Sequence, residues 1–158
     1  MQIALLGEEN VPYARGPAAS GGLSVPEMLL QLRAANAVLM AVLQVADRAA
    51  RPFIAGSRTD IEGATAIACD ELLVHTWDIG RGLGRPFVGP GDLVQCVVAR
   101  LFPWAPDDDE PWRIFLWCNG RIPLGARRRL GPDWPRWLAP REEWQGTDPT
   151  ESRKSATR

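Results

Sequence analysis

The sequence has few residues that ligate metals or form covalent links. Among 158 residues there is one histidine, His75, and there are three cysteines, Cys69, Cys96 and Cys118. The cysteines are odd in number, lie far apart and form no CxxC pair. We therefore expect reduced thiols in an intracellular chain.

An excess of charge and long hydrophobic runs are also missing. The formal net charge is −1, which favours neither nucleic acid nor an anionic membrane as a partner. No stretch approaches the roughly 18 apolar residues of a membrane span. Residues 1–9 have no basic segment and too short an apolar run for a signal peptide. We expect a cytoplasmic protein.

What is present predicts one soluble, mainly helical body. An apolar fraction of 46% with 23% charged residues is typical of globular proteins, and 158 residues are enough to bury a core without disulfides. Residues 3–6 form a short apolar fragment with no cap before it. This fragment indicates the end of a longer helix that is missing upstream.

Four helices are expected after that fragment. The first follows the capping box Ser24-Val25-Pro26-Glu27, and its apolar residues recur at steps of three and four until near Arg51. The other predicted ranges are about 61–83, 91–102 and 112–118. The residues expected to face the core are Met28, Leu32, Ala35, Leu39, Val42 and Ala46 in the first helix, and Ile67, Ala68, Leu72 and Ile79 in the second.

Two stretches resemble ligand-binding loops but lack the necessary context. Gly80-Arg81-Gly82-Leu83-Gly84 closes a predicted helix, whereas a phosphate loop joins a strand to a helix. The acidic run Asp107–Glu110 lacks the alternating ligands and central glycine of a calcium loop. It is better explained as an N-cap before Pro111.

The character of the chain changes after Gly125. Residues 126–145 combine arginines with Trp134, Trp137 and Trp144 among prolines, without a helical or strand period. Arginines among aromatics can stack on single-stranded nucleic acid, but an apolar strap packed on the helical body is the stronger interpretation. Residues 146–158 are polar and without a period, so we expect a disordered tail.

The stretch around His75 carries the candidate chemistry. Glu71 and His75 lie four residues apart and project from the same face of a helix, where a carboxylate and an imidazole could share a metal ion. On spacing alone, an ordinary surface pair or a helix hydrogen bond is the better explanation, since two ligand-type residues are fewer than a metal motif requires.

The wider string has a family resemblance. Asp70-Glu71-Leu72-Leu73-Val74-His75-Thr76-Trp77-Asp78-Ile79, followed by Gly82-Leu83-Gly84 and Pro86-Phe87, resembles the motif of the mycothiol-dependent maleylpyruvate isomerase metal-binding domain, within the DinB-like group. Leu101-Phe102-Pro103 and Leu116-Trp117 are similar to the C-terminal part of its actinobacterial members. The resemblance covers residues 1–145 and implies an all-α fold, a four-helix bundle that binds one divalent metal through two histidines and a glutamate.

By this match Glu71 is the second metal ligand and His75 is the third. The first ligand of the family is a histidine on the helix before Ile3, and this chain has no residue there. Asp78 or a cysteine could substitute, but Cys69 points about 200° away from Glu71, and Asp78 better suits the role of an acceptor that orients His75. We expect a shortened bundle over residues 1–125, with an incomplete metal site.

The resemblance implies a metal-binding protein with thiol-dependent isomerase or transferase ancestry. Zinc is the expected ion, with mycothiol or a similar low-molecular-weight thiol as the second cofactor, because a metal-bound thiol loses its proton near neutral pH. The expected partner is a small-molecule substrate or thiol, and a homodimer stays open. The alternative is a non-catalytic helical domain that keeps the fold and binds a ligand or a partner.

Overall fold

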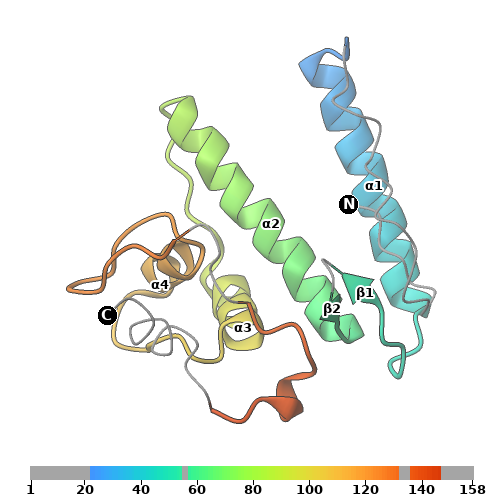
Figure 1. Ribbon diagram of the computed structural model, residues 1–158. Helices are drawn as coiled ribbons and strands as arrows, with labels where there is room; N and C mark the ends of the chain where they lie inside the picture. Colours follow the sequence, from blue (N-terminus) through green and yellow to red (C-terminus); the bar gives the residue numbers. More distant parts are fainter. Residues whose placement is uncertain (1–21, 55–56, 132–135, 147–158) are drawn as a thin grey trace. The chain divides into compact units, whose positions relative to one another are not determined.

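The computed structural model describes residues 22–54, 57–131 and 136–146 (Figure 1). The apolar fragment at 3–6, Trp134 and the expected disordered tail from residue 147 onward lie outside these ranges. The chain divides into two compact units, Met1–Ile61 and Glu62–Arg158, and each is described by itself. Helices make up most of the regular structure, so the all-α class is confirmed. The helices are α1 (Val25–Val45), α2 (Ile61–Gly82), α3 (Gly91–Leu101) and α4 (Pro111–Cys118), with a short 3₁₀ helix, η1 (Arg141–Glu143).

Helix α1 begins where the capping box predicts. The Glu27 carboxylate accepts hydrogen bonds from the backbone N–H of Ser24 at 2.7 Å and from its hydroxyl at 2.6 Å. These two bonds lower the pKa of Glu27. The helix ends at Val45, before Asp47, whose carboxylate accepts from the Ala49 N–H, so it is shorter than the pattern indicates.

The expected core face of α1 is wrong for the structure as described. None of its 21 residues is buried, and Met28 and Leu32 are among those with exposed side chains. An apolar stripe becomes a core face only when another element packs on it.

By length and composition α1 could cross a membrane, and within the described residues no other helix passes that test. This differs from the expectation of no membrane span, because a mean hydropathy over 18 residues tolerates the polar and charged positions that interrupt the apolar run.

A two-stranded antiparallel hairpin follows α1. Strands β1 (Phe53–Ile54) and β2 (Ser57–Arg58) pair with Phe53 opposite Arg58. The Thr59 N–H donates to the Pro52 carbonyl at 2.9 Å and extends the ladder by one bond. The hairpin leads directly into α2.

Helix α2 is the longest helix of the structure, and one side of it is buried. The buried residues of its second half include Asp70, Leu73, Val74 and Gly80. Gly80 is required there because a Cβ would lie 2.5 Å from the Arg85 carbonyl oxygen, where the chain turns back against the helix. The expected buried side is right for Ile67 and Ala68 and wrong for Leu72 and Ile79, which are exposed.

The core of the second unit lies where α3 and α4 meet, and it is rich in aromatic rings. Helices α3 and α4 contact each other, and α3 contributes Val94, Val97 and Leu101. The rings of Trp112 and Phe115 stack at 5.0 Å, and Trp104 lies edge-on to Phe102 and to Trp117, each at 5.8 Å. These rings fix the position of α4.

The predicted signals at the ends of α4 are confirmed. The Glu110 carboxylate caps the helix by accepting from the N–H groups of Trp112 and Arg113, both at 3.0 Å. The helix ends at Cys118 with Asn119 as its C-cap, and Gly120 follows with φ 65°. This end points Asn119 and Arg121 towards α2.

The segment after residue 136 is anchored to α3. The Trp137 N–H donates to the Leu101 carbonyl at 2.7 Å, and an Arg100 N–H donates to the Trp137 carbonyl at 3.3 Å. This segment carries Arg136 to the buried side of α2.

Candidate functional site

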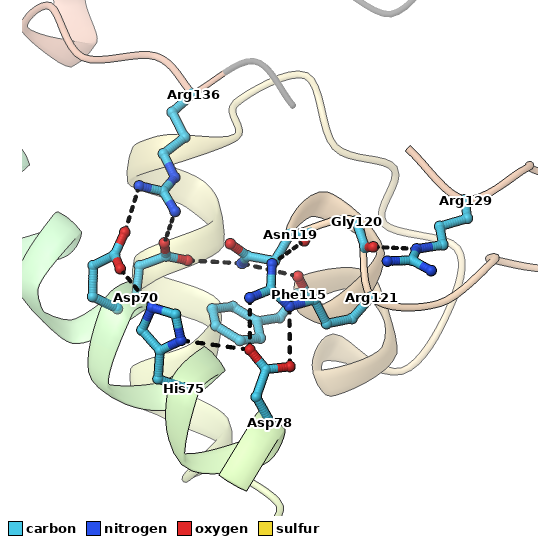
Figure 2. A network of polar contacts seen from close by, with 10 residues as sticks. Asp70, His75, Asp78, Phe115, Asn119, Gly120, Arg121, Arg129 and Arg136 are labelled. Carbon is cyan, nitrogen blue, oxygen red and sulfur yellow. Dashed lines mark hydrogen bonds and ion pairs between the residues drawn. The ribbon is translucent and has the colours of Figure 1, made fainter. Parts of the chain in front are cut away.

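Six charged or polar side chains gather around the middle of α2, together with the single histidine (Figure 2). We call these seven residues the α2 network. Four come from α2 itself, two follow α4 and one precedes Trp137. The members are Asp70, Glu71, His75, Asp78, Asn119, Arg121 and Arg136.

The predicted metal ligands converge. Oε2 of Glu71 lies 3.0 Å from Nε2 of His75, as the four-residue spacing predicts. The His75 side chain is 60% exposed and that of Glu71 is 37% exposed. The pair therefore lies at the open edge of the network, where an ion from solvent could reach both atoms.

Asp78 lies where an orienting acceptor belongs. Its Oδ2 is 3.5 Å from Nδ1 of His75, on the opposite side of the imidazole ring from Glu71. Arg121 donates two hydrogen bonds to the Asp78 carboxylate, at 2.7 and 3.2 Å, and these bonds are the main cause of the lowered pKa of Asp78. Asp78 is thus held as a carboxylate beside Nδ1, which leaves Nε2 free to face Glu71.

Arg136 forms ion pairs with the carboxylates of Asp70 and Glu71. One of its guanidinium nitrogens lies 2.8 Å from Oε1 of Glu71, and another lies 2.9 Å from Oδ2 of Asp70. Because Oε1 is held by Arg136, Oε2 is the oxygen that turns towards His75. Arg136 therefore sets the orientation of the candidate ligand.

Asp70, the residue before Glu71, is fully buried. Burial raises its pKa to about 6, against the opposing effects of the Arg136 charge and of a hydrogen bond from Asn119 at 2.8 Å. The same Asn119 amide also donates to the Phe115 carbonyl at 3.2 Å, which ties the network to α4. A buried carboxylate with these two partners explains why the chain returns to α2 after residue 119.

The cysteines lie outside the network's contacts. Burial raises the pKa of the Cys118 thiol, and it also raises that of Cys69, where the charge of Asp70 adds to the effect. All three cysteines are free thiols. Both shifts disfavour the thiolate that a metal would bind, in agreement with the expectation that Cys69 is a poor ligand.

Sequence reasoning missed Asn119, Arg121 and Arg136. Each pairs with α2 from at least 43 positions away, which no local spacing reveals. The available signal was chemical: a carboxylate on the buried side of a helix needs a partner, and arginine is the most suitable one.

The chain matches no family model, no curated protein and no solved structure. Within the described residues, no three histidine, cysteine, aspartate or glutamate side chains form a group that could hold a metal. Glu71 and His75 are a converging pair, and further ligands are needed for a complete coordination shell.

Proposed function

We propose that the chain binds a divalent metal ion, zinc first, through Oε2 of Glu71 and Nε2 of His75. The observation that supports this is the order of contacts around His75: Glu71 faces one ring nitrogen and Asp78, held by Arg121, faces the other. Metal-bound histidines have this arrangement, with a carboxylate behind the ring that fixes the tautomer.

The charge of the α2 network also favours a cation. It contains three carboxylates, Asp70, Glu71 and Asp78, and two guanidiniums, Arg121 and Arg136, so it carries one net negative charge while His75 is neutral. A divalent ion or a proton on His75 would compensate that charge. Metal analysis distinguishes the two cases, because only a bound divalent ion is retained as metal in the purified protein.

The activity proposed for such a site is thiol-dependent isomerisation or group transfer, with mycothiol or a similar thiol, in a cytoplasmic protein of the DinB-like group. A divalent ion at the site would acidify a bound thiol or water near neutral pH. The chain's own residues hold the ligands: Arg136 fixes Glu71, and Asp78 fixes His75. The exposed edge leaves room for a small substrate.

Metal analysis tests the proposal directly. Protein dialysed against zinc and then against buffer is expected to retain the ion, and His75→Ala is expected to lose it. Asp78→Asn should weaken binding by about tenfold or more, since it removes the carboxylate that orients the ring. Glu142→Gln, an exposed carboxylate on η1, is the matched control and should bind as the parent does. Absence of retained zinc or nickel in the parent chain would overturn the proposal.

A second candidate function is a non-catalytic helical domain that binds a small ligand. A cavity of about 430 Å³ is lined by residues of α3, of α4, of the loop between them and of η1, among them the apolar Val98, Phe102 and Ile114 and the charged Asp107 and Arg141. Cavities of this size take small molecules. Binding of apolar ligands that is lost on filling the cavity with Ala99→Trp, in a protein without metal, would favour this candidate.

A further inference from the structure

The cavity lined by α3, α4 and η1 carries charged side chains as well as apolar ones. Its volume of about 430 Å³ is near the lower end of the range for ligand pockets, roughly 300–1,000 Å³. Asp107 contributes a carboxylate to the lining and Arg141 contributes a guanidinium. The apolar lining residues include Val98, Ala99, Phe102, Pro103 and Ile114. A ligand that matches this lining is small, with an apolar part and charged groups of its own.

The walls of the cavity are held by contacts within the chain. Helices α3 and α4 contact each other, and Phe102 packs edge-on against Trp104 at 5.8 Å. In the loop between these helices, the Ala105 N–H donates to the Phe102 carbonyl at 2.8 Å. Before η1, the indole N–H of Trp137 donates to the Pro140 carbonyl at 3.1 Å. A cavity that is formed in advance binds its ligand without the cost of ordering these segments.

The acidic run at residues 107–110 uses three of its four carboxylates within the chain. Asp108 and Asp109 form ion pairs with arginines, at 3.0 and 3.1 Å, and Glu110 caps α4. Within the part of the chain that the structure describes, the Asp107 carboxylate has no such partner. Because Asp107 lines the cavity, a cationic group of a ligand could pair with it.

Arg141 supplies the opposite charge. Its guanidinium lies over the ring of Trp144, 5.1 Å from the ring centroid. No carboxylate among the described residues forms an ion pair with it. A guanidinium that stacks on a ring keeps N–H groups at its edge, and these fit a carboxylate. Arg141 is therefore suited to an anionic group of a ligand in the same cavity.

We infer that the cavity binds a small apolar zwitterion, namely an amino acid with an apolar side chain. Its ammonium group pairs with Asp107, its carboxylate pairs with Arg141, and its side chain packs among the apolar lining residues. An apolar acid would leave Asp107 unpaired, and an apolar amine would leave Arg141 unpaired. The inference rests on the second candidate function, ligand binding in this cavity, and is independent of metal.

The expected preference for the zwitterion is moderate. Asp107 and Arg141 are both exposed, so water screens each ion pair with the ligand. Each pair should therefore increase the affinity roughly three- to fivefold. The apolar lining provides the rest of the affinity.

Isothermal titration calorimetry of the full chain in EDTA tests this inference with three ligands of one shape. L-phenylalanine carries both charges, phenethylamine lacks the carboxylate, and 3-phenylpropanoate lacks the ammonium group. Phenylalanine is expected to bind roughly three- to fivefold more tightly than either analogue.

Two variants should give a crossed pattern. Arg141→Gln should weaken the binding of phenylalanine and of 3-phenylpropanoate, and should leave phenethylamine no weaker. Asp107→Asn should weaken the binding of phenylalanine and of phenethylamine, and should leave 3-phenylpropanoate no weaker. Asp108→Asn is the matched control, because this neighbouring carboxylate pairs with Arg127 and does not line the cavity. It should bind all three ligands as the parent does.

The outcomes separate this inference from the candidate function on which it rests. Equal affinities for the three ligands, or variants that weaken all three alike, would overturn the zwitterion and keep the cavity as a ligand site. Ethylbenzene, the uncharged analogue, tests the cavity alone: its binding without that of phenylalanine would have the same meaning. No binding of any of the four would overturn both. Phenylalanine binding that Ala99→Trp leaves intact would also overturn the inference, because this substitution fills the cavity.

Discussion

Helices α1 and α2 are nearly equal in length, 21 and 22 residues, and both carry apolar residues at helical spacing, yet α2 buries one side and α1 buries nothing. The difference lies in what each helix meets. The second half of α2 has polar and charged partners from distant parts of the chain, namely Asn119, Arg121 and Arg136. An amphipathic pattern therefore shows that a helix can bury one face. Whether that face is buried depends on the segments of the chain that pack against it.

The largest expected contrast comes from one substitution made in two places. Leu101→Ala removes a fully buried side chain and should lower the free energy of unfolding by about 3 kcal/mol. Leu30→Ala, on α1, removes an exposed side chain and should change it by less than about 0.5 kcal/mol. Urea denaturation followed by circular dichroism measures both. A cost at Leu30 as large as that at Leu101 would mean that α1 packs on a partner in solution.

The free energy of unfolding should depend on pH with opposite signs for Asp70 on α2 and for Glu27 on α1. The pKa of Asp70 is raised to about 6, so the folded state holds this proton more tightly than the unfolded chain does. Its contribution to the free energy of unfolding therefore grows as pH falls from about 6 towards 4, by roughly 3 kcal/mol, and is lost as pH rises. Asp70→Asn should abolish this part of the pH dependence.

Glu27, on α1, has the reverse sign. Its pKa is lowered by hydrogen bonds from Ser24, so its contribution is present above the ordinary glutamate pKa and is lost as pH falls through the lowered value. Denaturation curves of the parent, Asp70→Asn and Glu27→Gln between pH 4 and 7 measure both signs. Equal slopes for the parent and Asp70→Asn would contradict the burial of an unprotonated Asp70.

Removing the helix caps should change the free energy of unfolding least. It also shows whether each helix unfolds together with the rest of its unit or by itself. Glu110→Ala should cost about 1 kcal/mol of global stability, because it frees two N–H groups of a helix within the core. Ser24→Ala should loosen only the first turn of α1. Hydrogen exchange read helix by helix distinguishes these outcomes: faster exchange throughout the second unit is expected for Glu110→Ala and only in residues near 25–28 for Ser24→Ala.

Local features of the fold could be predicted from the sequence, because short-range chemistry determines them. Ser24-Val25-Pro26-Glu27, Glu110-Pro111 and Asn119-Gly120 each satisfy or end a helix within a few residues. The geometry of Glu71 and His75 was equally local, since a four-residue spacing brings the two side chains together on any α-helix.

Non-local choices could not be predicted. Leu72 and Ile79 are as apolar as Leu73 and Val74, and the segments far along the chain that pack on α2, such as the one with Asn119, decide which of these residues are buried. The pairing of Arg136 with Asp70 and Glu71 joins residues 65 or more positions apart in the sequence, and no local pattern specifies it. Metal binding, the DinB-like fold and the thiol chemistry stay predictions, because they depend on ligands and partners beyond one chain's local pattern.

The distribution of aromatic rings has a practical consequence for every experiment above. All seven tryptophans follow Ile61, and Trp104, Trp112 and Trp117 lie within the stacked and edge-on cluster of the second unit. Tryptophan emission is therefore a reporter on that unit alone and is silent about α1. A fluorescence melt and a circular dichroism melt of the same sample would record two different parts of the molecule, and any gap between them would measure how strongly the two units unfold together.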